Sequence, residues 1–235
     1  MIFNLSVIIP AFNEEDSISK SLDQIVSFLS KQDFDFEVIV VDDGSSDKTN
    51  EIIKDRNDIQ LITIEHNKGK GFAVKTGVLE AKNNFVLFMD ADHAIPINYI
   101  LDFKSVITDY DIVIGSKYLN QTENYPLYRK VVGKAFSLLK FYITGLKIKD
   151  TQCGFKLFKG SVAKELFSLS QIKGWCFDVE ILLLSQKKNY SVKEFAIKLS
   201  NVNTPSNISI LNSGTQMFLD LLKLRIKFKR GDYTL

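Results

Sequence analysis

Two aspartates, Asp90 and Asp92, stand one residue apart directly after the apolar run Phe85–Met89. An uninterrupted apolar run of this length is typical of a strand that is buried on both faces of a parallel sheet. Side chains two positions apart on an extended chain point the same way. Both carboxylates should therefore leave the sheet at its carboxyl edge, where open α/β sheets bind ligands. Adjacent negative charges are stabilised by a cation, and oxygen ligands suit Mg²⁺ or Mn²⁺. The alternative is an ordinary acidic turn.

The elements that would position these carboxylates form a regular alternation of strands and helices. Apolar strands are predicted over residues 5–9, 36–41, 59–64, 85–89 and 111–114. Helices are predicted between them, over 17–31, around 52–53, after 67–71 and over 97–106. This alternation predicts an α/β fold with a doubly wound, mostly parallel sheet.

Polar residues follow four of the predicted strands, whose carboxyl ends share one edge of the sheet. One polar terminus is ordinary loop chemistry, whereas four at the same edge indicate a binding site. The pairs are Asn13 and Glu14, Asp42 and Asp43, Asn67 and Lys70, and Asp90 and Asp92.

The composition of the 235-residue chain, 45% hydrophobic and 25% charged, is ordinary for a soluble globular protein. A net charge of +2 gives no general field for polyanions, so no nucleic-acid partner is expected. Cys153 and Cys176 provide no disulfide framework and fit a reducing compartment. We expect no signal peptide, since no basic leader precedes the first strand. No uncharged apolar run reaches the roughly 18 residues of a membrane span.

The second half of the chain is less regular. A helix is predicted over 127–143, a bend over 150–159 and a strand over 192–199. Asp178 and Glu180 are interpreted either as a general base pair or as the polar start of a helix. Trp175 is expected in the core rather than in contact with a lipid. Residues 217–229 predict an amphipathic helix with many basic residues, interpreted as a solvated face or a membrane-surface contact.

Other sites with related chemistry do not fit the spacing. Residues 10–14 lack the G-x-G-x-x-G turn of dinucleotide-binding proteins, and residues 44–49 lack the spacing of a P-loop. An EF-hand loop that began at Asp90 would have Ile95 at its glycine position. A dehalogenase-type phosphatase carries its D-x-D on the first strand, whereas here three βα units precede it.

Several motifs together resemble the family 2 glycosyltransferases with the GT-A fold: SVIIPAFNEE at 6–15, VVDDGS at 40–45 and Asp90-Ala91-Asp92. Motifs at 67–71, 115–117, 150–158 and 175–180 are similar to the polyprenyl-phosphate glycosyltransferases. The dolichyl-phosphate β-glucosyltransferase branch is the closest, and the dolichyl-phosphate mannose synthases come next. The resemblance implies one GT-A domain over 1–235. Residues 1–117 would form its nucleotide-sugar-binding half. Residues 118–235 would form its acceptor-binding half, which ends in the amphipathic C-terminal helix.

The resemblance also implies roles for individual residues. The donor-binding residues would line the nucleoside pocket, with Glu14 near the ribose and Asp42 at the base, and Asp90 and Asp92 would hold Mg²⁺ or Mn²⁺ on the diphosphate. The donor set comprises Pro10, Phe12, Glu14, Asp42, Lys70, Asp90, Ala91 and Asp92. The acceptor phosphate would meet the cations Lys117, Arg129 and Lys156, and Asp150 stands where a catalytic base is proposed in relatives.

The chain departs from the family pattern at two places. Mannose synthases carry a glutamine where this chain has Ala94, and the neighbouring His93 is interpreted as a supporting or surface residue. Many relatives have arginine where Lys117 stands, and lysine keeps the charge but loses bidentate phosphate binding.

The expected reaction is a metal-dependent, inverting transfer of a hexose to a polyprenyl or dolichyl phosphate by a peripheral enzyme at the cytoplasmic face of a membrane. Glucose from UDP-glucose is the first choice. A phosphate monoester has a second pKa of about 6, so the acceptor needs cations more than a base. Asp150 is therefore expected mainly to orient other groups. The alternatives are a GDP-mannose donor, a saccharide hydroxyl acceptor and a non-enzymatic nucleotide-sugar-binding module. A membrane-protein partner is left open.

Overall fold

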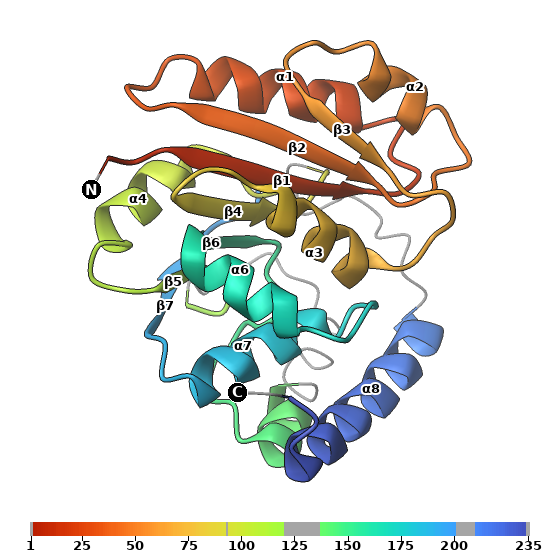
Figure 1. The fold of residues 1–235 in the computed structure, drawn as a ribbon, viewed down its shortest axis with the longest axis vertical. Coiled ribbons are helices and arrows are strands. Elements are labelled where there is room, and N and C mark those ends of the chain that lie inside the picture. The colour runs from red at the N-terminus through yellow and green to blue at the C-terminus, as the bar shows by residue number, and fades with distance from the viewer. Residues whose placement is uncertain (1, 93, 120–136, 201–209, 234–235) are drawn as a thin grey trace.

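The computed structural model describes residues 2–92, 94–119, 137–200 and 210–233. One seven-stranded sheet runs through the molecule in the order β3-β2-β1-β4-β6-β5-β7 (Figure 1). Both halves of the chain contribute strands to it. The strands are β1 (Leu5–Ala11), β2 (Phe36–Asp42), β3 (Gln60–Thr63), β4 (Phe85–Met89), β5 (Ile112–Ser116), β6 (Phe155–Lys159) and β7 (Val192–Ala196).

The sheet is mostly parallel, as the alternation of strands and helices predicted. Strands β1 to β4 pair in parallel, and β5 pairs in parallel with β7. Strand β6 runs antiparallel between β4 and β5. The prediction of a bend over 150–159 was therefore wrong for residues 155–159. The reversed strand brings the segment before it, residues 150–154, to the carboxyl end of β4, where Asp90 N–H donates to the Gly154 carbonyl at 3.1 Å.

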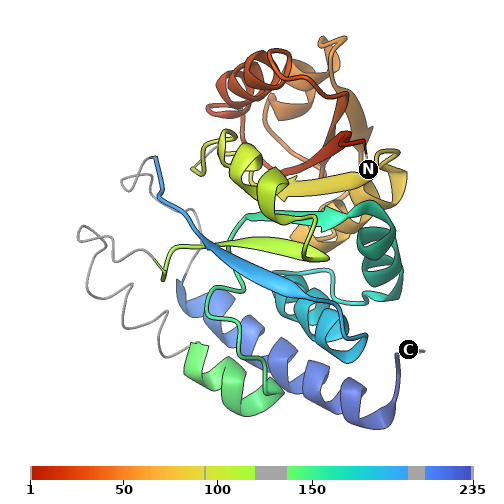
Figure 2. The same cartoon turned by 90° about the vertical axis from the view of Figure 1, so that its left-hand side faces the viewer.

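Helices cover both faces of the sheet (Figures 1 and 2). On one face, α1 (Ile18–Leu29) and α4 (Tyr99–Val106) bury Leu22, Ile25 and Phe103 in one hydrophobic core. On the other face, α3 (Lys70–Glu80), α6 (Gly160–Leu169) and α7 (Phe177–Lys187) build a second core. The short helix α2 (Thr49–Lys54) follows β2. The spacing of apolar residues on these helices explains which side of each is buried.

The C-terminal helix α8 (Ile210–Arg230) packs beneath the second core through Leu221 and Leu224, which are fully buried. A shorter helix over residues 137–144 lies beside it in both views (Figures 1 and 2). The rest of the helix predicted over 127–143 lies outside the described residues. None of the described helices combines the length and the apolar character needed to cross a bilayer.

Candidate active site

The loops after β1 and β2 are joined at the carboxyl edge by hydrogen bonds from side chains. Asn13, whose φ of 55° is left-handed, accepts from Ser46 N–H at 2.8 Å through Oδ1. Glu14 N–H donates to Thr49 Oγ1 at 2.7 Å. These contacts hold the predicted donor residues in place, and the Phe12 ring beside them remains 45% exposed. Pro10 is partly buried at the end of β1.

Glu14 shares this edge with the aspartate pair after β4. Burial raises the pKa of Glu14, the charges of Asp92 and Asp90 raise it further, and the hydrogen bond from Ser17 only partly opposes them. The three carboxylates thus share this edge of the sheet, and their negative charge favours the approach of cations.

The two adjacent aspartates that follow β2 have different contacts. Asp42 is buried and accepts from Ser45 N–H at 3.1 Å and from Asn50 Nδ2 at 2.8 Å. Asp43 accepts from the backbone N–H groups of Lys68 and Gly69 at 2.9 and 2.8 Å. Asp43, to which the sequence assigned no individual role, thus anchors the loop that leads into Lys70.

Lys70 reaches from the start of α3 to the aspartate pair. Its Nζ lies 2.6 Å from Asp90 Oδ1, 4.8 Å from the centre of the Trp175 ring and 5.4 Å from that of Phe88. Burial lowers the pKa of Lys70, but Asp90, Asp178 and Asp92 outweigh it, so the pKa lies above its ordinary value. Trp175 is 39% exposed, so the expectation that it lies in the core was wrong. It contacts the Lys70 cation at the rim of the site.

The aspartate pair itself is held by backbone groups. A Cβ added to Gly154 would lie 1.9 Å from Asp90 Oδ2, so only glycine leaves room for this carboxylate. Asp92 Oδ1 accepts from Ala94 N–H at 3.0 Å. Within the described part of the chain, no three metal-binding side chains of the His, Cys, Asp and Glu types gather at one point, and His93 lies outside it. Two carboxylates at an open edge fit a Mg²⁺ or Mn²⁺ ion that also takes oxygens from a diphosphate and water.

Lys156 lies underneath the site, 1% exposed. Its Nζ donates to Asp178 Oδ1 and to the Cys153 carbonyl, both at 2.5 Å. Burial raises the pKa of Asp178, and the cations Lys156 and Lys70 only partly offset this effect. A contact between Lys156 and an acceptor phosphate would require this ion pair to open, and it stays a prediction.

The two acidic side chains at the start of α7, Asp178 and Glu180, both accept hydrogen bonds from other groups of the protein. Glu180 is fully buried and accepts from the backbone N–H groups of Gln171 and Ile172 and from the Tyr233 hydroxyl. Asp178 and Glu180 lie in the first turn of α7, where acids suit the helix dipole. The geometry favours the helix-start interpretation over a general base pair.

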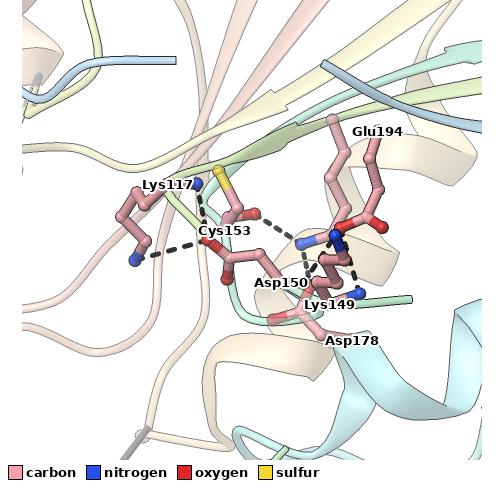
Figure 3. Close-up of polar contacts among 7 residues, drawn as sticks. Lys117, Lys149, Asp150, Cys153, Asp178 and Glu194 are labelled. Atoms are coloured by element: carbon pink, nitrogen blue, oxygen red, sulfur yellow. Dashed lines mark hydrogen bonds and ion pairs between the residues drawn. The ribbon is translucent and has the colours of Figure 1, made fainter. Parts of the chain in front are cut away.

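Asp150 is buried beside Lys117 (Figure 3). Asp150 Oδ2 accepts from Lys117 N–H at 3.0 Å and lies 4.0 Å from Lys117 Nζ. Glu194 on β7 accepts from the backbone N–H groups of both Lys149 and Asp150, at 3.0 and 3.1 Å. Glu194 was missed because a single glutamate on a strand carries no motif. Arg129 lies outside the described residues.

Cys153 shows that the predicted donor and acceptor sides meet. The thiol is fully buried, as expected, and burial raises its pKa to about 12. The charges of Asp150, Lys117, Lys156 and Asp90 all act on it as well. The segment that contains Cys153 connects the two predicted sides, because Asp150 contacts Lys117 and Gly154 packs against Asp90.

Comparison with known proteins identifies the family of this chain. The model of "Glycosyl transferase family 2" matches residues 6–167. The chain belongs to glycosyltransferase family 2. The fold class and the family predicted from the motifs are thus confirmed, and the chain is a glycosyltransferase.

Two proteins of similar sequence carry the name dolichyl-phosphate beta-glucosyltransferase. The Dictyostelium discoideum protein is 34% identical over 247 residues, which are 97% of this chain and 75% of the relative. The Homo sapiens protein is 31% identical over 252 residues, which are 98% of this chain and 78% of the relative.

Among solved structures, glucosyl-3-phosphoglycerate synthase from Mycobacterium tuberculosis in complex with Mn²⁺, uridine-diphosphate and phosphoglyceric acid is similar. Its TM-score is 0.69 at 18% identity, with 94% of this chain and 76% of that chain covered. At this identity the likeness shows the fold, which is GT-A.

Proposed function

We propose that this family 2 glycosyltransferase transfers glucose from UDP-glucose to a dolichyl or other polyprenyl phosphate, with inversion to a β-linked product. The names of its relatives support the sugar and the acceptor. The observation that carries the proposal is that the segment 150–154 contacts both predicted sides of the site. Gly154 packs against the Asp90 carboxylate, and Asp150 accepts from Lys117 N–H at 3.0 Å.

Asp90 and Asp92 would hold Mg²⁺ or Mn²⁺ at the donor diphosphate. The solved neighbour that contains Mn²⁺ and uridine-diphosphate supports this metal choice. When bound, the ion would stabilise the negative charge that develops on the leaving diphosphate. Glu14, Pro10 and Phe12 would line the nucleoside pocket, and Asp42 would contact the base.

The acceptor side of the proposed reaction depends on cations. A phosphate monoester is largely dianionic at neutral pH, so its oxygen is already a nucleophile. Lys117, whose ammonium is partly exposed, would draw the acceptor phosphate toward the sugar. Asp150 would orient Lys117 through the backbone contact at 3.0 Å and the ammonium contact at 4.0 Å.

A polyprenyl acceptor lies in a membrane, and α8 with the neighbouring helix over 137–144 offers a surface for one. Exposed apolar side chains gather on these two helices beside the basic residues of α8. They are Leu138, Phe141, Tyr142, Phe218, Leu219, Leu222 and Ile226. We propose that this surface binds the enzyme peripherally to the cytoplasmic face of a membrane.

Flotation with anionic phospholipid vesicles tests the membrane contact. Exchange of Leu219 and Ile226 for serine should reduce the bound fraction severalfold. The matched change of Leu79 and Leu101, which are similarly exposed on α3 and α4, should leave binding unchanged. Equal behaviour of the two double variants would contradict this surface.

Product analysis with a panel of nucleotide sugars and a short polyprenyl phosphate tests the reaction. The protein should transfer glucose from UDP-glucose, which gives polyprenyl glucosyl phosphate, faster than it transfers mannose from GDP-mannose or galactose from UDP-galactose. Preferred turnover of GDP-mannose would reject the proposed sugar and favour the mannosyltransferase alternative.

A further inference from the structure

The ion pair between Lys70 and Asp90 occupies the place where a metal would bind. Lys70 Nζ lies 2.6 Å from Asp90 Oδ1, and the other oxygen, Oδ2, faces Gly154 so closely that an added Cβ there would lie at 1.9 Å. A divalent ion at Oδ1 would therefore meet the Lys70 ammonium at close range, and two cations on one oxygen repel each other. We propose that Lys70 is a resident counter-ion of Asp90, which a metal displaces and which then turns to the donor diphosphate.

The contact is suited to exchange because it is electrostatic. Asp90 Oδ1 is shielded from solvent, and within the described part of the protein no backbone N–H group donates to it. The group that lies against it is the Lys70 ammonium at 2.6 Å, which stands on a flexible side chain. A lone pair of this oxygen remains available for a metal once the ammonium moves.

The backbone that carries Lys70 is fixed, so the movement is confined to its side chain. Asp43 binds the N–H groups of Lys68 and Gly69. Gly69 has a left-handed φ of 101°, and a Cβ there would lie 2.6 Å from the Lys173 carbonyl. The flexible four-carbon stem of Lys70 can then change the position of its charge while its Cα stays in place.

The displaced ammonium would keep one of the contacts that it makes beside Asp90. The Trp175 ring, 4.8 Å from Nζ, lies at the exposed rim and offers a cation–π contact that does not depend on Asp90. Charge also balances in the exchange. A divalent ion would replace Lys70 beside Asp90 and Asp92, and the freed ammonium would meet the negative diphosphate.

The consequence is that metal and nucleotide help each other to bind. Metal alone must displace Lys70 with no diphosphate to receive it, so its affinity is reduced. The nucleotide supplies the diphosphate that receives the Lys70 ammonium, so it strengthens metal binding. By linkage, the metal strengthens nucleotide binding by the same factor. This inference rests on the proposed nucleotide-sugar site and adds a role for Lys70 within it.

Lys70→Met tests the proposal, because methionine fills a similar space without the charge. Mn²⁺ binding to the nucleotide-free protein, followed by the electron paramagnetic resonance signal of free Mn²⁺, should become about tenfold tighter. UDP binding in the presence of Mg²⁺, measured by calorimetry, should become about tenfold weaker. A gain in Mn²⁺ affinity together with a loss in UDP affinity is what the displacement of a counter-ion predicts.

Two further variants complete the test. Lys68→Met removes the same charge two residues away, where Lys68 Nζ lies over the Phe72 ring, and should change neither affinity. Lys70→Arg keeps the charge and should keep weak Mn²⁺ binding, which shows that the charge and not the packing matters. Thermal unfolding of each variant confirms that it is folded.

The inference is overturned if folded Lys70→Met binds Mn²⁺ no more tightly than the wild type, or if Lys68→Met shows the same gain. The proposed function fails in a different way. In that case the wild-type protein binds no UDP in the presence of Mg²⁺ or Mn²⁺, whatever residue 70 is.

Discussion

Gly154→Ala should disable the donor site while the fold stays intact. The added Cβ would lie 1.9 Å from Asp90 Oδ2, 2.2 Å from its Cγ and 2.6 Å from its Oδ1. Carbon atoms at Cβ positions almost never approach closer than 3.0 Å, so the carboxylate must move by about 1.1 Å, the difference between 3.0 and 1.9 Å. Gly154 is not in the left-handed region, and alanine can adopt its backbone conformation.

The size of the effect follows from this displacement. Misplacement of a catalytic group by about 1 Å can cost about 100-fold in rate. Rotation of a partly exposed carboxylate away from its rotamer costs only about 1 kcal/mol of stability. We expect glucosyl transfer to fall about 100-fold and the melting temperature to fall by only a few degrees.

Steady-state transfer and thermal unfolding should be compared with those of Gly174→Ala. The nearest atom to a Cβ at Gly174 is Asp220 Oδ2 at 3.9 Å, an ordinary contact. Gly174→Ala should therefore keep nearly full activity. Full activity of folded Gly154→Ala would refute the role given to Asp90 and its tight packing against residue 154.

Three further variants separate chemistry, positioning and stability. Asp92→Asn should nearly abolish transfer, whereas Asp150→Asn should leave measurable turnover because the acceptor phosphate needs no strong base; equal and complete loss in both folded variants would contradict this difference. Glu194→Gln weakens the two backbone contacts that hold residues 149 and 150. This variant should raise the KM for the acceptor severalfold and leave the KM for UDP-glucose unchanged. A rise confined to the KM for UDP-glucose would exclude an acceptor-side role of Glu194. Asp111→Asn should cost about 1 kcal/mol of stability at pH 7 in denaturant unfolding. Burial raises the pKa of Asp111, but hydrogen bonds from Ser191 and Lys159 outweigh it, so the pKa is lowered. The Asp111 contribution to stability is then present above about pH 4 and disappears as the pH falls through the lowered pKa, so a constant difference down to pH 2 would argue against it.

The parallel part of the fold was predictable because its signals are local. Polar residues stand at or shortly after the ends of strands β1, β2 and β4, and parallel strands bring these ends to one edge. That rule places Glu14, Asp90 and Asp92 at the same edge, and the charges of both aspartates raise the pKa of Glu14.

Strand β6 could not be predicted in the same way. Its segment Phe-Lys-Leu-Phe-Lys alternates only in part, and its partners in β4 and β5 are far away in the sequence. Lys156 looks like a cation that faces solvent, and it is buried only because Asp178 of α7 meets it. Pairings between distant charges leave no periodic trace in the sequence.

Neighbouring carboxylates pose a related problem. The sequence pattern indicates that Asp42 and Asp43 both follow β2, but not which contacts each one makes. In the structure, Asp43 accepts hydrogen bonds from the loop before Lys70, and Asp42 accepts them from Ser45 and Asn50. Trp175 was expected in the core because large aromatic residues usually pack there, and it lies instead at the rim, in contact with the Lys70 cation.

The central claim is that one edge of the sheet joins a nucleotide sugar to a phosphate acceptor. Its most direct test is one incubation of the protein with UDP-glucose, Mg²⁺, a short polyprenyl phosphate and an equal amount of the matching polyprenol. We predict release of UDP and formation of polyprenyl β-glucosyl phosphate, with no transfer of glucose to the hydroxyl group of the polyprenol. Transfer of glucose to the polyprenol hydroxyl at a comparable rate would contradict the claim.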